Sequence, residues 1–396
     1  MKKKKIAFFI SHPIQYISPL FRKLAKNEFI DLRVYYFSDE TINKSFKDKE
    51  FGKEIKWDTD LLGGYKYKFI KNNSISPSIY NMPFGLVNIN SYKEINNNNY
   101  DLVIVHGWNY VSHWIVFISS IILKVPILLR AETPHKQELL KSKIKVLIKR
   151  MLLKPLFNKI SGFLSIGTQN KNFFKSYKVQ EKKIYFAPYA IDNDSFRNNY
   201  LNNKVNKIDF RKKYNLNKYN KIVLFVGKLI DKKNPIDLLK AFHELNDENN
   251  CLVFVGDGNN KEKMKDYIQR NNISNVILVG FKNQSELVEF YVLSDIFVLP
   301  SGLGETWGLV VNEAMNYSLP IIVSDTVGCS DDLIVDNGFT FKEKDIDDLS
   351  IKLNKLLKAN NLDEMGENSY NIIKEYSYEN IEKAILEALN NVVVGK

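Results

Sequence analysis

Two glutamates, Glu305 and Glu313, are separated by seven residues in the segment PSGLGETWGLVVNEAMNYSLPIIVSD, which runs from Pro300 to Asp325. Glu305 follows a glycine-rich turn, and Glu313 falls in a predicted short helix. A carboxylate has two acceptor oxygens, so it can receive hydrogen bonds from both hydroxyls of a diol. The pair therefore suits a ligand rich in hydroxyl groups. The alternative is that Glu305 is a charge at a helix N-terminus and Glu313 a solvated helix residue.

The turn that precedes these acids also has the features of an anion site. Gly302 and Gly304 give a flexible turn, and the helix is predicted to start near 306–308. Free N–H groups at a helix N-terminus attract a phosphate, and the helix dipole adds to the attraction. A carboxylate among such donors, Glu305, then needs a different task, such as binding sugar hydroxyls.

A second candidate anion site lies in VGKLIDKKNP, where Gly227 permits a tight turn and Lys228 follows at once. Lys232 and Lys233 precede a proline suited to a helix start, so cations and free backbone N–H groups could hold a diphosphate. The alternative is a run of solvated surface lysines. Gly256, in GDGNN, is compatible with close backbone approach to a ligand or with a simple turn.

Short apolar, β-branched runs alternate with helical patterns along the whole chain, and this predicts an α/β protein with buried parallel strands. The series appears twice. The runs are Ile6–Ser11, Leu32–Phe37, Leu102–His106, Ile127–Arg130, Phe163–Ile166, Ile184–Ala187, Ile222–Val226, Leu252–Val255, Val276–Val279, Ile296–Leu299 and Ile321–Ser324.

We therefore expect two doubly wound, Rossmann-like domains, 1–193 and 205–375, joined by a polar, Asn-rich linker, 194–204. Residues 376–396 are predicted to form a helix that packs back on the first domain. In open parallel sheets, ligands bind beyond the carboxyl ends of the strands. The residues that follow the strands are therefore the candidates for function.

The motifs VGKLIDKKNP, FVGDG, VGF, SDIFVLPS, GETWGLVVNEAM, LPIIVSDTVGCSDDLI and NGF follow in this order between about Lys221 and Phe341. Together they resemble the family 4 glycosyltransferases of the GT-B fold, retaining enzymes that use nucleotide-diphosphate sugars. The resemblance implies two parallel-sheet domains that face each other across a cleft. The seven-residue spacing of Glu305 and Glu313 is the family's signature, E-x7-E.

The resemblance also implies roles for the second half of the chain. Glu313 would bind the nucleotide ribose, Glu305 would bind hydroxyls of the donor sugar, and Lys228 and Lys233 would clamp the diphosphate. The donor-binding set is Gly227, Lys228, Lys233, Gly256, Gly304, Glu305, Thr306, Trp307, Gly308, Leu309 and Glu313, with the backbone of 306–309 on the diphosphate. Lys228 stands where the family more often has Arg. Lysine keeps the positive charge but lacks the bidentate fork of the guanidinium group. Gly328, Cys329 and Asp332 replace the usual Gly-Gly and Glu.

Strand ends in the first half supply the acceptor or sugar side. The turn SHPIQY resembles a subset of these transferases, and its His12 and Gln15 could touch donor phosphate, acceptor or both. The remaining candidates are His106 and Trp108 in VHGWN, and Arg130 and Glu132 in LLRAETPHK. His12 and His106 join Glu305, Lys228 and Lys233 as expected catalytic residues. Arg130 and Glu132 could equally form an internal ion pair.

The formal net charge of +12 is unevenly divided, because residues 1–200 carry 33 Lys and Arg against 16 Asp and Glu. Much of this charge lies in 136–157, where Leu140, Ile144, Leu147, Ile148 and Met151 repeat at helical spacing among seven cations and one acid. The pattern is typical of an interfacial helix on anionic lipid. The alternative is a core-packed helix with a solvated basic face. No nucleic-acid recognition motif is present.

Two cysteines give no disulfide framework and no zinc spacing, which favours a reducing compartment. The run Ile6–Ile10 is too short for a signal peptide and predicts a strand. The sequence Asp58-Thr59-Asp60 matches the metal motif of GT-A enzymes, but no apolar strand precedes it, so a loop is expected. We predict no metal and no cofactor, and a cytoplasmic protein with a peripheral position at the inner face of the cell membrane.

The sequence thus predicts a retaining glycosyltransferase that moves a sugar from a nucleotide-diphosphate sugar to a hydroxyl of a glycan or lipid-linked acceptor, in cell-surface polysaccharide or glycolipid synthesis. Two alternatives share this architecture: a catalytically inactive nucleotide-sugar-binding relative and a nucleotide-sugar epimerase. A phosphorylase would need a lysine for pyridoxal phosphate in a matching motif, and none is apparent.

Overall fold

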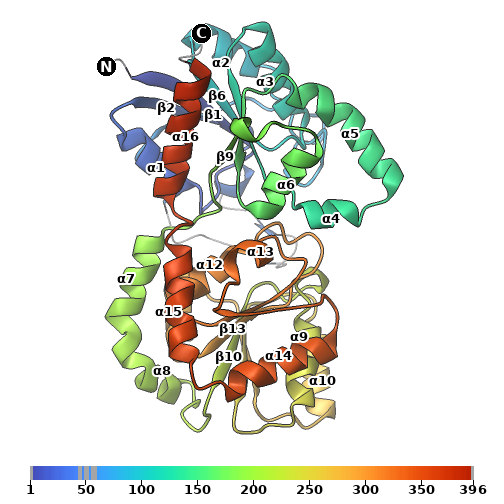
Figure 1. The fold of residues 1–396 in the computed structure, drawn as a ribbon, viewed down its shortest axis with the longest axis vertical. Coiled ribbons are helices and arrows are strands. Elements are labelled where there is room, and N and C mark those ends of the chain that lie inside the picture. Colours follow the sequence, from blue (N-terminus) through green and yellow to red (C-terminus); the bar gives the residue numbers. More distant parts are fainter. Residues whose placement is uncertain (1–2, 43–46, 49–52, 55–59, 394–396) are drawn as a thin grey trace. The chain divides into compact units, whose positions relative to one another are not determined.

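The computed structural model describes residues 3–42, 47–48, 53–54 and 60–393 and shows two compact units (Figure 1). Unit 1 comprises the described residues within 1–46, 59–189 and 378–396, and unit 2 those within 47–58 and 190–377. Each unit is built on its own parallel sheet. In the described residues, no helix combines the length and the apolar character needed to cross a membrane.

Unit 1 contains a seven-stranded parallel sheet in the order β5-β2-β1-β6-β7-β8-β9. The strands are β1 (Lys4–Ile10), β2 (Ile30–Tyr36), β5 (Lys66–Phe69), β6 (Leu102–His106), β7 (Ile127–Ala131), β8 (Gly162–Ser165) and β9 (Ile184–Phe186). The order reverses between β1 and β6, so the carboxyl ends of these two strands flank the topological switch point. His106 pairs in register with Arg130 on β7.

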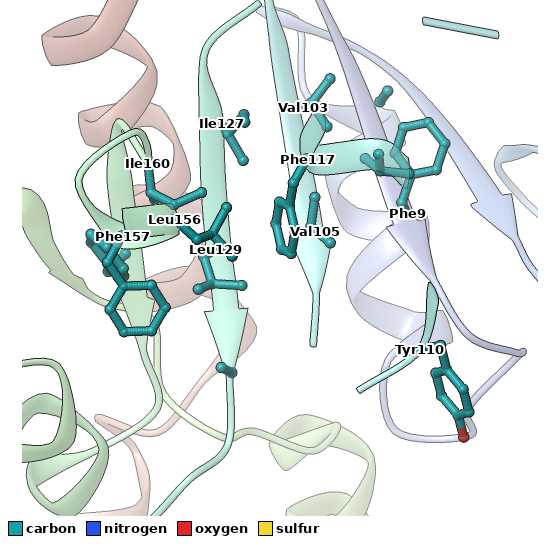
Figure 2. Close-up of a cluster of buried hydrophobic side chains, with 14 of the residues drawn as sticks. Phe9, Val103, Val105, Tyr110, Phe117, Ile127, Leu129, Leu156, Phe157 and Ile160 are labelled. Carbon is teal, nitrogen blue, oxygen red and sulfur yellow. The ribbon is translucent and has the colours of Figure 1, made fainter. Parts of the chain in front are cut away.

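The helices of unit 1 bury their apolar sides against this sheet. They are α1 (Ser18–Lys26), α2 (Ser91–Asn98), α3 (Val111–Ile122), α4 (His135–Leu139), α5 (Lys143–Phe157), α6 (Thr168–Ser176) and α16 (Tyr378–Val393), with short turns η1 (Glu40–Ile42) and η2 (Glu181–Lys183). Figure 2 shows part of the core, in which Phe117 of α3 and Phe157 of α5 lie among Val105 and Leu129 of the sheet. Although α16 comes last in the chain, it packs on β8, β9 and α1.

Unit 2 contains a six-stranded parallel sheet in the order β12-β11-β10-β13-β14-β15, and its switch point lies between β10 and β13. The strands are β10 (Ile222–Val226), β11 (Cys251–Val255), β12 (Val276–Gly280), β13 (Ile296–Leu299), β14 (Ile321–Ser324) and β15 (Gly338–Phe341). The two-residue strands β3 (Lys47–Asp48) and β4 (Lys53–Glu54) pair with each other.

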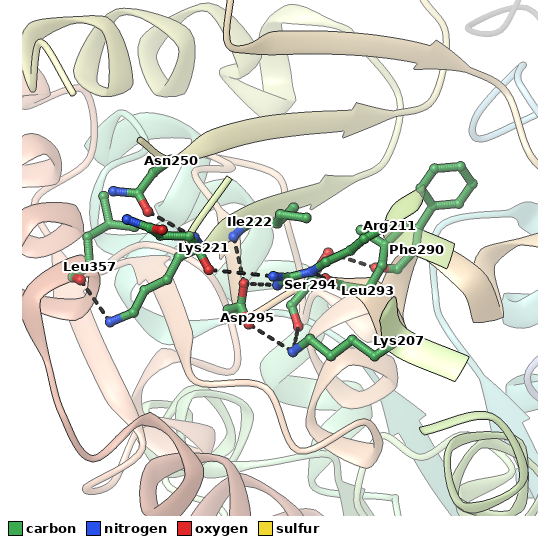
Figure 3. Close-up of polar contacts among 11 residues, drawn as sticks. Lys207, Arg211, Lys221, Ile222, Asn250, Phe290, Leu293, Ser294, Asp295 and Leu357 are labelled. Carbon is green, nitrogen blue, oxygen red and sulfur yellow. Dashed lines mark hydrogen bonds and ion pairs between the residues drawn. The ribbon is translucent and has the colours of Figure 1, made fainter. Parts of the chain in front are cut away.

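The helices of unit 2 are α7 (Asn193–Asn203), α8 (Lys207–Lys213), α9 (Pro235–Glu244), α10 (Lys261–Arg270), α11 (Gln284–Leu293), α12 (Leu309–Asn316), α13 (Ser330–Leu333), α14 (Ile346–Lys358) and α15 (Leu362–Ile373), with turns η3 (Lys204–Asn206) and η4 (Asp231–Lys233). Figure 3 shows how Asp295 ties α8 to the sheet. Its carboxylate accepts from Arg211 at 2.5 Å, Lys207 at 2.8 Å and the N–H of Ile222 at 2.6 Å.

Residues 194–204 differ from the expectation, because they form α7 and the start of η3 instead of a linker. Asp192 caps this helix by accepting a hydrogen bond from the N–H of Ser195 at 3.0 Å. Phe196 packs against Tyr317, and Arg197 donates to Ser318 at 2.8 Å. The polar composition hid this helix because a single buried residue, Phe196, attaches it to unit 2.

Candidate functional site

Two glycine turns meet at the carboxyl end of β10 and β11. The N–H of Gly227 donates to Val255 at 3.0 Å, and that of Gly256 to Gly280 at 2.8 Å. A Cβ on Gly256 would lie 1.8 Å from the carbonyl oxygen of Gly227, and the φ of Gly256 is +149°. The backbone of Gly256 therefore lies close to the neighbouring turn and not to a ligand. This contact holds the turn with Gly227 and Lys228 at the switch point beside β13.

Glu305 lies in the turn after β13 and forms an ion pair with Lys233 from η4. The residue is only 9% exposed, so its charge has little access to water. Burial acts to raise the pKa of Glu305, but Lys233, together with Lys232 and Ser301, outweighs this effect and holds the pKa below its ordinary value. The structure thus brings together two predicted site residues, and it keeps Glu305 ionised as an acceptor of hydrogen bonds.

Backbone hydrogen bonds hold the turn that carries Glu305 from two sides. Gly302 donates to Lys232 of η4 at 2.9 Å, and Asn234 donates from its side chain to Pro300 at 3.0 Å. On the other side, the N–H of Gly328 donates to the carbonyl oxygen of Glu305 at 3.2 Å. Gly328, which belongs to the segment that departs from the family pattern, therefore contacts this turn directly.

Helix α12 begins at Leu309, slightly later than predicted, and Gly308 precedes it with a φ of +95°. Trp307 is 2% exposed, and its indole N–H donates to Asn312 at 2.9 Å. Its ring packs on Tyr376. Trp307 therefore anchors the start of α12 in the core, and only its backbone can serve a ligand.

Glu313 lies one helical turn inside α12 in an aromatic environment. Its Oε2 accepts a hydrogen bond from the hydroxyl of Tyr291 at 2.7 Å, and the Tyr291 ring stacks on Tyr317 at 4.9 Å. Burial raises the pKa of Glu313 to about 7, and the hydrogen bond from Tyr291 offsets only part of this effect. Among the described residues, Tyr291 is the one hydrogen-bond partner of this carboxylate. Its second oxygen remains available to a ligand hydroxyl.

In unit 1, the strand ends at the switch point bring together His106 and Glu132, whose Nε2 and Oε1 atoms lie 2.7 Å apart. The same Oε1 accepts from the hydroxyl of Tyr189 at 2.8 Å, and Tyr189 hydrogen-bonds Tyr16 in turn. Burial acts to raise the pKa of Glu132, but the hydrogen bonds from His106 and Tyr189, together with the charges of His106 and Arg130, outweigh it and lower the pKa overall.

Tyr16 and Tyr189 were missed by the sequence analysis, although both follow predicted strands. Tyr16 ends the SHPIQY turn, and Tyr189 lies three residues beyond β9. Position after a strand was thus a usable signal, but nothing in the sequence showed that the two hydroxyls meet.

His12 lies close enough to His106 for their charges to interact. Its Nδ1 is 2.9 Å from the hydroxyl of Ser11. Burial, and next the charge of His106, lower the pKa of His12 to about 4, so His12 is neutral at pH 7. Gln15 lies two residues after Pro13 in the same partly buried turn. The first turn therefore presents a neutral imidazole at the carboxyl edge of the sheet.

Two predicted site residues have structural contacts instead. Arg130 is 4% exposed and donates to the carbonyl oxygens of Ala187 at 2.7 Å and Pro188 at 3.1 Å. In the described residues it forms no direct salt bridge with Glu132, although the two charges lie near enough to interact. A role of Arg130 in the site stays a prediction. Trp108 is half-buried and stacks on Phe173 against the core.

No group of three or more His, Cys, Asp or Glu side chains within the described ranges is arranged to hold a metal ion. Of the Asp58-Thr59-Asp60 motif, Asp58 and Thr59 lie outside the described residues. Asp60 accepts from the N–H groups of Leu62 and Gly63, both at 3.0 Å, in a turn. Independence from metal and cofactor stays a prediction.

Residues 206–378 match the family model described as "Glycosyl transferases group 1", so most of unit 2 is similar to that glycosyltransferase family. An uncharacterized glycosyltransferase of Methanocaldococcus jannaschii is 30% identical over 39% of this chain and 44% of its own length. A sulfoquinovosyl transferase of Arabidopsis thaliana is 33% identical over 34% of this chain and 26% of its own. A lipopolysaccharide 1,2-N-acetylglucosaminetransferase of Salmonella typhimurium is 25% identical over 43% and 48%. The chain thus spans less than half the length of these relatives.

Two solved structures resemble the whole chain. Anabaena HepE in complex with UDP and glucose has a TM-score of 0.69 at 15% identity, covering 98% of this chain and 99% of that one. A glycosyltransferase from Rickettsia africae has a TM-score of 0.71 at 15% identity, covering 100% of both chains. With the two parallel sheets, this likeness confirms the predicted α/β GT-B fold.

Proposed function

We propose that this protein is a retaining glycosyltransferase that moves a sugar from a nucleotide-diphosphate sugar to a hydroxyl group. The observation that carries the proposal is the buried, ionised Glu305 beside the start of α12, with Glu313 further along the same helix. A buried carboxylate that stays charged can accept hydrogen bonds beside the one from Lys233, and sugar hydroxyls are suitable donors. The sequence similarity of 206–378 to glycosyltransferases supports the same assignment.

Unit 2 would hold the donor. The backbone N–H groups at the start of α12 and the ammonium of Lys228 would bind the diphosphate, and Glu313 would accept from the ribose diol. Lys233 forms an ion pair with Glu305, so part of its charge is already compensated. We therefore assign Lys233 to positioning Glu305 as well as to the diphosphate, a double role that the sequence alone did not suggest.

In the transfer step, the bond between the anomeric carbon and the diphosphate oxygen breaks, and a bond to the acceptor oxygen forms on the same face. The acceptor proton passes to the departing phosphate. Lys228 and the α12 N-terminus would stabilise the negative charge that develops there, which is electrostatic catalysis. In unit 1, neutral His12 and the His106–Glu132 pair would contact the sugar or the acceptor.

A panel of nucleotide-sugars, started with UDP-glucose because HepE is described with UDP and glucose, tests the proposal. Binding is measured by calorimetry and turnover by chromatography, with and without acceptor glycans. Glu305→Gln should lower turnover by at least about a hundredfold while nucleotide affinity changes little. Glu313→Gln should weaken nucleotide affinity instead.

The panel also separates the alternatives. Turnover of the nucleotide-sugar to an isomer without acceptor would indicate an epimerase. Binding without turnover, with every donor and acceptor tried, would indicate an inactive relative. An inverted anomeric configuration in the product would contradict retention.

We propose a glycan or lipid-linked acceptor, in the synthesis of a cell-surface polysaccharide or glycolipid, at the cytoplasmic face of the cell membrane. The Salmonella relative, named as a lipopolysaccharide transferase, supports this setting. Transfer of labelled sugar into a lipid-extractable product by cells that express the protein would test it.

A further inference from the structure

Helix α5 has two apolar faces, and only one of them packs into unit 1. Leu153, Leu156 and Phe157 are buried against the core, with exposures of 2%, 7% and 4%. The other face is open to solvent. It consists of Ile144, Leu147, Ile148, Met151 and Leu152, with exposures of 72%, 58%, 54%, 68% and 59%.

The spacing explains why these residues avoid the core. Ile144, Leu147, Ile148 and Met151 follow one another at three- and four-residue steps, so they line one side of a helix with 3.6 residues per turn. The buried residues Leu153, Leu156 and Phe157 fall on the opposite side. The alternative of a core-packed apolar face is therefore wrong for the residues at 144–151 that suggested it, although the helix does pack on the core through 153–157.

The exposed apolar surface continues into α4, where Leu139 and the adjoining Leu140 are 69% and 62% exposed. Single exposed apolar side chains are normal on proteins, but a continuous row of large ones marks an interaction surface. We call this row, 139–140 with the five exposed residues of α5, the α4–α5 face. Figure 1 shows α4 and α5 following each other at the edge of unit 1.

Cations border the α4–α5 face. Lys143 and Lys154 lie along one margin of α5 and Lys145 along the other, and all three are exposed. The negative charge of Glu138 is compensated by two lysines, because its carboxylate accepts hydrogen bonds from Lys141 at 2.9 Å and from Lys149 at 2.8 Å. An apolar row between basic margins is complementary to a lipid surface with anionic headgroups.

A second copy of this chain fits the face less well, because two such surfaces would bring like charges together. A membrane span does not fit either, since α5 has 15 residues and its margins are charged. The helix has the dimensions to lie on a bilayer and not to cross it.

We propose that the α4–α5 face docks this protein on an anionic bilayer surface, with its apolar side chains in the boundary between headgroups and acyl chains. The inference goes beyond the proposed activity, because the face would bind lipid whatever reaction the protein performs. If the acceptor is lipid-linked, docking would also confine the enzyme to the surface where its acceptor lies.

The test is co-sedimentation of the full chain with vesicles of phosphatidylglycerol and phosphatidylcholine in equal parts, and with vesicles of phosphatidylcholine alone. We expect binding to the anionic vesicles that weakens with salt. Leu147→Glu with Met151→Glu should reduce it by at least about tenfold. Lys143→Ala or Lys154→Ala should each reduce it by about fivefold.

The matched control is Val205→Glu with Ile208→Glu, at residues of unit 2 that are 79% and 65% exposed, and this variant should bind like the wild type. Thermal melts verify that every variant is folded. Three results would overturn the proposal: no wild-type binding to anionic vesicles, equal binding by the Leu147/Met151 variant, or an equal loss in the control. Light scattering would reveal a fourth contradicting result. In it, the wild type is a dimer, the Leu147/Met151 variant is a monomer, and the two bind vesicles equally.

Discussion

Glu313 holds a proton more tightly than an ordinary glutamate, because its burial among aromatic rings disfavours the charged form. Its pKa is about 7 in the folded protein, against a reference value of 4.5. Between these pH values the folded state binds more protons than the unfolded chain. The contribution of this protonated carboxyl to the stability of unit 2 is therefore lost as the pH rises through this window.

The comparison of wild type with Glu313→Gln isolates this effect, since the variant cannot titrate there while every other group is shared. From about pH 4 to about pH 8, the free energy of unfolding of the wild type should fall by about 3 kcal/mol relative to the variant. Urea unfolding at the two pH values measures the difference. A constant difference would show that Glu313 is ionised throughout.

The same proton should affect donor binding. A ribose diol donates to a carboxylate, so binding of a nucleotide-sugar should favour the ionised form of Glu313 and release a proton below about pH 7. Calorimetry in two buffers of different ionisation enthalpy would detect this release, and Glu313→Gln should abolish it. Proton uptake on binding would contradict the assigned role.

Residue types at strand ends predicted which side chains to inspect, but not which of them face a ligand. Glu305 and Lys233 were selected separately, and their ion pair arises from loop contacts that no local pattern encodes. Arg130 and Trp108 followed the same rule and make structural contacts. A strand end has two faces, and the sequence does not say toward which face a side chain points.

At the level of the elements, long apolar runs located eleven strands, because strands that are buried on both faces consist of apolar residues. The runs failed at β5 and β15, which lie at the edges of the two sheets. The strand β5, KYKF, has exposed or half-exposed residues throughout, and β15, GFTF, has one buried residue beside two half-buried and one exposed. The other two edge strands, β9 and β12, were located, so the misses are due to the sequences KYKF and GFTF, which contain no continuous apolar run.

The turn after β11 allows a test of this element's role in forming the site. A Cβ on Gly256 would collide with the backbone of Gly227, whereas a Cβ on Gly280, also at positive φ, would meet nothing within 3.8 Å. Gly256→Ala should therefore cost about 1–3 kcal/mol more than Gly280→Ala, as overpacking does. It should also weaken nucleotide binding, because the turn that carries Lys228 must shift.

Chemical denaturation and calorimetry measure the two effects, and Gly280→Ala serves as the control for backbone strain. If both variants lost the same stability, the contact between the two glycine turns would not be tight.

At the scale of the whole molecule, the chain contributes 47–58 to unit 2, enters the main part of that unit after Tyr189 and returns to unit 1 at Tyr378. Helix α16 then buries Ile381, Ile385 and Leu389 in unit 1. Fully burying such side chains stabilises a protein by about 1.5–3 kcal/mol each, as an upper estimate. The stability of unit 1 therefore depends on α16, which the chain adds only after unit 2.

Truncation after Ser377 should raise amide hydrogen exchange in β8, β9 and α1, which contact α16, and leave the sheet of unit 2 protected. Mass spectrometry resolves the two units in one experiment. Truncation after Val393 is the matched control and should change neither. Equal deprotection of β10 and β13 would show that the two units do not unfold separately.

Tyr189 and Tyr378, where the chain leaves and re-enters unit 1, both contact Tyr16: the hydroxyl of Tyr189 bonds that of Tyr16, and the hydroxyl of Tyr378 donates to the carbonyl oxygen of Tyr16 at 2.6 Å. A protease that cut the backbone just after Tyr189 would therefore release nothing. The C-terminal fragment would still hold the N-terminal one through its final helix. Two separately expressed pieces, divided at that point, should reassemble into a working protein.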